Sequence, residues 1–317
     1  TSGVTMVKEN QSAVTEFILQ ALSSQPRAQT ALFILLLAVY LITVVGNILI
    51  MAVIRADCQL HSPMYFFLAN LSFIDICYIS SFTPQMLVSL VAKKSTISFS
   101  GCAAQMYFSL GFGIAECVLL GVMAYDRHVA ICRPLLYITV MNRKVCTRMV
   151  VASWVSSLLS SMVLNGLTLQ LPFCGPHALN HYFCEVPAML VLACTDTAFV
   201  GLVIFTFSIL IVLIPFLFIV FSYAHIFSTI LKTQSAGVQY KTFSTCGSHL
   251  MVVTIFYGSA ICTYMNPAPR TRRDRDKVVS LFYTIVAPVL NPLIYSLRNT
   301  DMQHALSRAM HSPRSLF

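Results

Sequence analysis

Two carboxylates lie deep inside apolar stretches of the sequence, where an acidic side chain is costly. Asp75 occurs in LSFIDICYI and Glu116 occurs in GFGIAECVLLG. In helical geometry Asp75 lies about 21 Å past His61, and Glu116 lies about 16 Å before Arg127. The two acids are therefore expected at similar depth, and two adjacent like charges in a low dielectric cannot both stay ionised without a cation. Either one carboxyl holds a proton or a cation bridges the pair.

The bulk composition indicates which elements carry these acids. Of the 317 residues, 57% are hydrophobic and only 10% are charged, and the mean hydropathy is +0.78. Soluble domains carry about 25% charged residues, so the deficit indicates a membrane protein. Lipid accepts helices or closed barrels, and the apolar runs are too long and uniform for barrel strands. An all-α, seven-transmembrane helix bundle is predicted from the runs 29–54, 62–91, 102–131, 148–171, 198–230, 246–266 and 277–297.

The two ends of the chain suggest an orientation in the membrane. Asn10 begins the glycosylation sequon NQS ahead of the first run, which predicts an extracellular N-terminus and a cytoplasmic C-terminus. Lys and Arg favour the inner side only weakly, because five of them cluster in the outer loop RTRRDRDK. The expected divisions are an extracellular N-terminus at 1–28, the seven-transmembrane domain at 29–297, and a cytoplasmic amphipathic helix and tail at 298–317.

Four of the eleven cysteines are expected on the outer, oxidising side of the membrane. Cys102 begins the third run, and Cys174, Cys184 and Cys194 lie in the loop after the fourth. An even number in that compartment predicts two disulfides. Four cysteines allow three pairings, however, and spacing does not choose among them. A single bridge with two free thiols is the alternative.

The third run places an unusual series of side chains on one side of a helix. Such a stripe suits a helix that carries a signal, although any bundle-facing stripe holds the polar residues that lipid excludes. Pro215, Pro288 and Pro292 interrupt later runs and are expected to bend them. At 100° per residue, the side chains near one face of the third run are Cys102, Met106, Ser109, Gly113, Glu116 and Arg127.

Several sequence motifs identify a family when they are taken together and in order. They resemble the olfactory receptors of the tetrapod (class II) type, a branch of the rhodopsin-like G-protein-coupled receptors. The resemblance covers essentially the whole chain and implies Cys102–Cys184 and Cys174–Cys194 disulfides. The motifs are LHSPMYFFLANLSFID (60–75), MAYDRHVAICRPLLY (123–137), SY (222–223), KTFSTCGSHL (241–250), FYG (256–258) and PVLNPLIYSLRN (288–299).

The resemblance also implies a sodium site in the middle of the bundle. Its positions here are Asp75, Glu116 and Asn291, aided by Ser72, and the ion would stabilise the inactive state. A proton shared between the two carboxyls is the alternative. No other cofactor is expected.

A switch at the inner end of the bundle is implied by the DRH triplet. Asp126 would hold Arg127 at rest, beside His128, and release it toward Tyr223 and the G protein on activation. Tyr223 and Tyr295 are hydroxyls at similar depth that could bridge through water.

A ligand pocket is expected in the outer half, between the third, fifth, sixth and seventh runs. The expected set contains no charge, which is typical of a site for a small, mostly hydrophobic ligand with one hydrogen-bonding group. Tyr257 would form the floor of the pocket and trigger the response. The residues carried over from the family are Met106, Ser109, Leu110, Gly113, Ile114, Phe207, Ser208, Ile211, Tyr257, Ala260, Ile261, Tyr264, Ser280 and Thr284.

The function implied is that of an odorant receptor in the plasma membrane, which activates a stimulatory heterotrimeric G protein and raises cAMP. An ion-coupled transporter using Asp75 and Glu116 is an alternative, although no internal repeat supports it. The same receptor serving as a chemosensor outside the nose is another. An enzyme is not expected, because the sequence shows no nucleophile–base pair, metal motif or phosphate loop. The loop RTRRDRDK is interpreted as a solvated loop and not as a nucleic-acid site.

Overall fold

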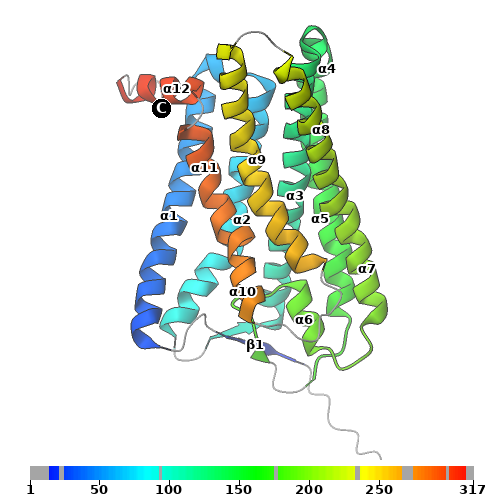
Figure 1. The fold of residues 1–317 in the computed structure, drawn as a ribbon. Helices are drawn as coiled ribbons and strands as arrows, with labels where there is room; N and C mark the ends of the chain where they lie inside the picture. Colours follow the sequence, from blue (N-terminus) through cyan, green and yellow to red (C-terminus); the bar gives the residue numbers. More distant parts are fainter. Residues whose placement is uncertain are drawn as a thin grey trace, which may run out of the picture.

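Long helices run side by side in one bundle (Figure 1). The computed structural model describes residues 14–20, 25–92, 95–174, 178–232, 236–265, 274–297 and 300–311. The bundle helices are α1 (Pro26–Ala56), α2 (Pro63–Val91), α3 (Phe99–Cys132), α5 (Arg143–Leu169), α7 (Ala198–Ser208), α8 (Ile214–Leu231), α9 (Ala236–Tyr264), α10 (Asp274–Leu281) and α11 (Ala287–Leu297).

The predicted helix bundle is confirmed. Six helical stretches in the described residues are long and apolar enough to cross a membrane, and α9 adds the shorter apolar segment His249–Tyr264. Each of the seven predicted runs coincides with one of these elements. The largest difference is in α9, which begins at residue 236 and not at 246. Its first turns are polar, so hydropathy alone did not include them in the span.

Two π-helical segments occur just before prolines in the bundle. The segment η3 (Ile209–Leu213) joins α7 to α8 shortly before Pro215, and η4 (Phe282–Val286) joins α10 to α11 shortly before Pro288. Proline cannot donate the usual helical hydrogen bond, and single π turns are a known way to absorb such an interruption. Each of these two prolines, at which a bend was predicted, thus follows a widened helical turn with a buried side chain, Val212 in η3 and Tyr283 in η4.

Short elements close one end of the bundle, called the inner end below because the sequence predicts that it faces the cytoplasm. They are η1 (Cys58–Leu60), η2 (Pro134–Leu136), α4 (Tyr137–Val140) and α12 (Thr300–His311). The helix α12 leaves the bundle sideways (Figure 1) and buries Met302 and Ala305 completely or nearly so. The exposed Arg308 of α12 donates a hydrogen bond from Nε to Oδ2 of Asp57, at 3.1 Å. The amphipathic character expected of this helix is thus present in its described side chains.

A small sheet closes the opposite end, which the sequence analysis did not anticipate. The strand β1 (Glu16–Leu19) lies between β2 (Thr96–Ser98) and β3 (Ala178–Leu179). It pairs antiparallel with β2, with Glu16 opposite Ser98, and parallel with β3, with Ile18 opposite Ala178. Short helix α6 (Val186–Leu192) follows in the same loop. The sheet therefore fastens the N-terminal segment to the loop between α5 and α7. The sequon at Asn10 lies outside the described residues.

Candidate functional site

A cavity lies in the outer half of the bundle, between α3, α7, η3 and α9. Its volume is about 70 Å³. Its wall is mainly apolar, with a few hydroxyls. Ten of the fourteen predicted pocket residues line it: Met106, Ser109, Leu110, Gly113, Ile114, Phe207, Ser208, Ile211, Ala260 and Tyr264.

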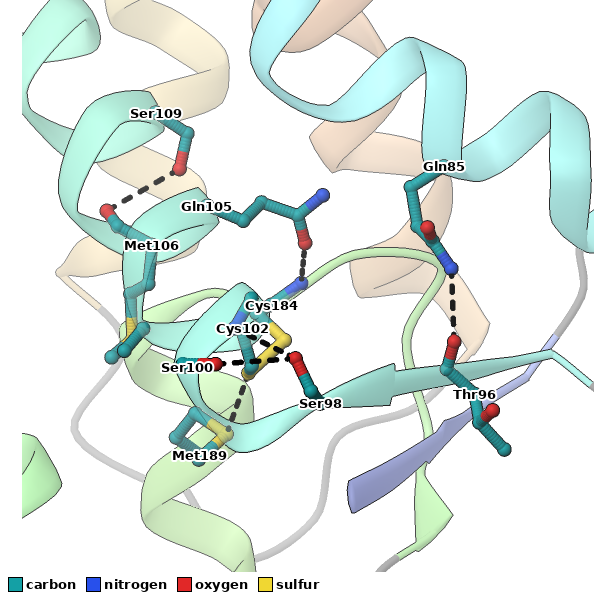
Figure 2. The surroundings of a disulfide bond; sticks show 12 residues. Gln85, Thr96, Ser98, Ser100, Cys102, Gln105, Met106, Ser109, Cys184 and Met189 are labelled. Atoms are coloured by element: carbon teal, nitrogen blue, oxygen red, sulfur yellow. Dashed lines mark hydrogen bonds between the residues drawn. A yellow bond between two sulfur atoms is a disulfide. The ribbon is translucent and has the colours of Figure 1, made fainter. Parts of the chain in front are cut away.

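A disulfide fixes the loop that covers this cavity. Cys102, near the start of α3, is bonded to Cys184, with Cα atoms 5.5 Å apart. One turn further on, Oε1 of Gln105 accepts a hydrogen bond from the backbone N–H of Cys184 at 2.8 Å. Figure 2 shows Cys102 and Gln105 on the same side of α3, both meeting this loop. A second disulfide joins Cys174 to Cys194, so the loop has the two bridges that the family resemblance implied.

The covering loop brings one acidic side chain into the cavity wall. Glu185, next to the disulfide, lines the cavity and is only 3% exposed. Tyr283 donates a hydrogen bond from its hydroxyl to Oε2 of Glu185 at 2.9 Å, and Nε2 of His181 lies 3.3 Å from Oε1. The predicted set of pocket residues contains no charge because it was drawn from helix positions only, whereas this carboxyl comes from the loop.

Four predicted pocket residues do not line the cavity that the described residues form. Tyr257 lies below it, completely buried, and donates a hydrogen bond to the backbone carbonyl of Cys117 at 2.6 Å. Ser280 and Thr284 contact the covering loop, called the lid below. The Ser280 hydroxyl lies 3.3 Å from Nε2 of His181, and the Thr284 hydroxyl lies 3.4 Å from the hydroxyl of Tyr182. The fourth, Ile261, packs against the main hydrophobic core.

Ten lining residues were missed, and five of them had a signal in the sequence. Phe183, Glu185 and Val186 flank a cysteine tied to α3, so they had to lie over the cavity. Ile204 and Val212 are one turn before and one turn after Ser208, on the same helical face. The complete set of missed residues is Tyr78, Cys117, Leu164, Phe183, Glu185, Val186, Ile204, Val212, Phe256 and Tyr283.

A polar cluster lies deeper, in the middle of the bundle. Asp75 on α2 and Glu116 on α3 are both fully buried, and Asn291 on α11 connects them. The amide of Asn291 donates to Oδ1 and Oδ2 of Asp75 at 3.1 and 2.9 Å, and to Oε1 of Glu116 at 3.5 Å. Ser72 is buried one turn before Asp75. The structure thus brings the two carboxyls to one amide, as expected from their similar depth.

The oxygen atoms of this cluster fit a small cation. Oε2 of Glu116 and Oδ1 of Asn291 are buried without a hydrogen-bond partner. Buried polar atoms are rarely left in that state unless water or an ion satisfies them, and carboxylate and amide oxygens are the ligands that hard cations prefer. Two carboxyls sharing one amide also need a proton or a cation between them.

The inner end of the bundle contains two hydrogen-bonded pairs around Arg127. Oδ1 of Asp126 accepts a hydrogen bond from the hydroxyl of Tyr137 at 2.8 Å. The hydroxyl of Tyr223 lies 2.9 Å from Nδ1 of His249 on α9. No ion pair between Asp126 and Arg127 is found in the part of the chain that the structure describes.

This arrangement differs from the resting Asp126–Arg127 pair that the motif suggested. Burial, and then the Asp126 carboxylate, raises the pKa of the Tyr137 phenol, so that phenol remains a donor at neutral pH. His249 belongs to the quoted motif KTFSTCGSHL, which was the available signal for its role. The side chain of Tyr295 lies outside the described residues.

Comparisons with known proteins agree over most of the chain. Residues 36–312 match the family model described as "Olfactory receptor". The human protein Olfactory receptor 2D2 is 50% identical over 299 residues, covering 94% of this chain and 96% of the relative. Human Olfactory receptor 2G3 is 48% identical over 301 residues, covering 95% and 97%. Human Putative olfactory receptor 2B3 is 48% identical over 309 residues, covering 98% of each.

Proposed function

The chain belongs to the olfactory receptor family, and we propose that it binds small, mostly hydrophobic volatile ligands in the outer cavity and activates a stimulatory heterotrimeric G protein, raising cAMP. Members of this family are membrane-embedded receptors and not enzymes. The observation that carries the proposal is the mainly apolar cavity against α3, the helix whose inner end bears Asp126 and Arg127.

The size and lining of the cavity limit the ligand. A molecule that buries about 200 Å² of apolar surface gains about 5 kcal/mol, and part of this gain offsets the loss of its translational and rotational freedom. Such weak apolar binding favours broad tuning. Ser109, Ser208, Tyr264 and Glu185 in the wall offer hydrogen bonds, and we expect them to select among ligands of equal size.

The route from cavity to G protein follows α3. Ser109 and Gly113 line the cavity, Glu116 lies in the polar cluster one turn below, and Arg127 stands three turns further on. Because these positions share one helix, a shift of α3 caused by a ligand reaches all of them. The pairs Tyr137–Asp126 and Tyr223–His249 would then be exchanged for contacts with the G protein.

Sodium in the central cluster is part of the proposal. Asp75, Glu116 and Asn291 would hold the ion, aided by Ser72, and its charge would compensate the two carboxylates. The support is the set of buried, unpartnered oxygens described above. If Glu116→Gln responds to agonist with the same sodium dependence as wild type, the site holds a proton and not sodium.

A cAMP assay with a panel of odorants in transfected cells tests the proposed function. Arg127→Ala should abolish the agonist-driven rise while surface expression persists. Arg148→Ala is the matched control, because Arg148 is exposed on α5, and it should signal normally. Full signalling by Arg127→Ala would contradict the mechanism.

The orientation and the site of action belong to the proposal as well. An extracellular N-terminus at the plasma membrane places the disulfide-bonded loop in an oxidising compartment. The same receptor acting as a chemosensor outside the nose is the alternative, and the tissues that contain its transcript distinguish the two. No observation on the described residues favours the ion-coupled transporter.

A further inference from the structure

Three side chains with metal-binding atoms meet at the inner end of the bundle, away from the sodium cluster. His128 and Cys132 lie on α3, and His225 lies on α8. Their ligand atoms, two ring nitrogens and one sulfur, all lie within 4.8 Å of one another. The two imidazole rings are 5.0 Å apart between centroids and inclined by 28°.

The helical framework explains why these groups meet. His128 and Cys132 are four residues apart and therefore share one face of α3. On α8, His225 and Thr229 have the same spacing, and the Thr229 hydroxyl lies 3.5 Å from the Cys132 sulfur. The two helices thus face each other in matched register over two successive turns. The arrangement is set by backbone packing and does not depend on a flexible loop.

The state of the His128 ring suits metal ligation. Its Nδ1 is buried without a hydrogen-bond partner, so this ring nitrogen is available to a ligand. His225 is exposed and Cys132 is half-buried, so an ion has a path of entry.

The ligand set selects a class of metal. Two imidazoles and one thiolate suit a borderline-soft divalent ion of the zinc type, with water as the fourth ligand. Mg²⁺ and Ca²⁺ prefer oxygen ligands, and this group of three has none. Zn–N bonds of about 2.0 to 2.1 Å and Zn–S bonds of about 2.3 Å require ligand atoms about 3.4 to 3.6 Å apart in a tetrahedron. The ligand atoms, within 4.8 Å of one another, would have to approach by up to about 1.4 Å to reach these distances.

We propose that His128, Cys132 and His225 form a binding site for a zinc-type divalent transition-metal ion that ties α3 to α8. A ligand stabilises the conformation in which its contacts are best. The ion would therefore oppose any movement that separates the two helices beside Arg127. Bound zinc should lower the receptor's output, and this regulatory part rests on the proposed function.

The site itself is tested without a signalling assay. Purified full-length receptor in nanodiscs is titrated with Co²⁺, whose tetrahedral d–d bands and thiolate charge-transfer band report the ligands directly. Zn²⁺ should displace the Co²⁺ and bleach these bands. Cys132→Ser should lose the charge-transfer band, and His225→Ala should bind Co²⁺ at least about tenfold more weakly.

Two control variants separate this site from adventitious binding. Cys262→Ser removes an exposed free thiol on α9, and His304→Ala removes an exposed imidazole on α12. Both should keep the wild-type spectrum. Equal Co²⁺ binding by wild type, Cys132→Ser and His225→Ala would overturn the site.

The regulatory part is tested in cells with a zinc ionophore. Odorant-driven cAMP should fall in wild type and in Cys262→Ser, but not in Cys132→Ser or His225→Ala. An equal fall in all four would overturn the regulation while the Co²⁺ spectra still decide the site. A receptor that raises no cAMP with any odorant would count against the proposed function, and the spectra would be unaffected.

Discussion

The outer and inner ends of the bundle are held together by different kinds of interaction. The outer end has two disulfides and a three-stranded sheet that fix the lid over the cavity. The inner end relies on single hydrogen bonds, such as Tyr137 to Asp126 and Tyr223 to His249, each worth about 1 kcal/mol. Recognition is thus built on a covalent frame, and the response is built on contacts that can be exchanged.

Breaking the outer frame should have the largest effect. The Cys102–Cys184 bridge closes a loop with a sequence separation of 82, and loss of such a bridge costs about 2 to 5 kcal/mol. Cys102→Ala should therefore abolish surface expression or odorant response. Cell-surface labelling and cAMP measure the two effects.

The matched control for this change is Cys262→Ser, which removes an exposed free cysteine and should behave like wild type. Normal surface level and response in Cys102→Ala would show that the lid does not depend on its covalent frame.

A single inner contact should have an intermediate effect. Tyr223→Phe removes the hydroxyl that lies 2.9 Å from Nδ1 of His249 while keeping the stacked ring. A loss of about 0.5 to 1.5 kcal/mol should change ligand-free cAMP by roughly two- to tenfold at equal surface expression. Tyr125→Phe, whose ring packs against Phe218, should leave it unchanged. Equal ligand-free cAMP in the two variants would show that the Tyr223–His249 contact plays no part in the switch.

The exposed contact between Arg308 and Asp57, at the inner end, should have the smallest effect. Arg308 on α12 pairs with Asp57, and this hydrogen bond lowers the pKa of that carboxyl below its ordinary 3.8. Because the folded pKa is lowered, the pair contributes fully above the ordinary value and is lost only as pH falls through the lowered one. Exposed pairs contribute about 0 to 1 kcal/mol.

The Arg308→Ala variant should therefore lower thermal stability only slightly, by the same amount between about pH 6 and 8. Thermal unfolding of the purified receptor measures this, with Arg148→Ala as the exposed control. If the difference in unfolding temperature between wild type and Arg308→Ala changed between about pH 6 and 8, another titrating group would be responsible.

The fold could be predicted well from the sequence, because membrane helices are recognisable by their length and hydropathy. The prediction of helix bounds was less successful where polar residues continue a helix beyond its apolar part, as in the first turns of α9. The sheet of β1, β2 and β3 was invisible because its strands are only two to four residues long and pair across distant segments.

The cavity was predicted only in part. Ten of the fourteen pocket residues that the family resemblance supplied line it, and all ten lie on helices, but further helix positions and the covering loop were missed. Glu185 was missed because a loop carries it, and its position follows from a disulfide to a different segment. The Tyr223–His249 bond was missed for a related reason, because it joins two helices whose register no local pattern gives.

A cavity-filling substitution tests the central claim, that the outer cavity is the odorant site which drives the G protein. The atoms nearest to a Cβ added at Gly113 would belong to the Tyr78 side chain, at 3.8 Å, which is ordinary contact. Gly113→Leu should therefore fold and fill the cavity, while Gly201→Leu has nothing within 4 Å of the added Cβ. With an odorant panel and equal surface expression, we expect cAMP responses to disappear in Gly113→Leu and to persist in Gly201→Leu. Unchanged odorant responses in Gly113→Leu would contradict the account.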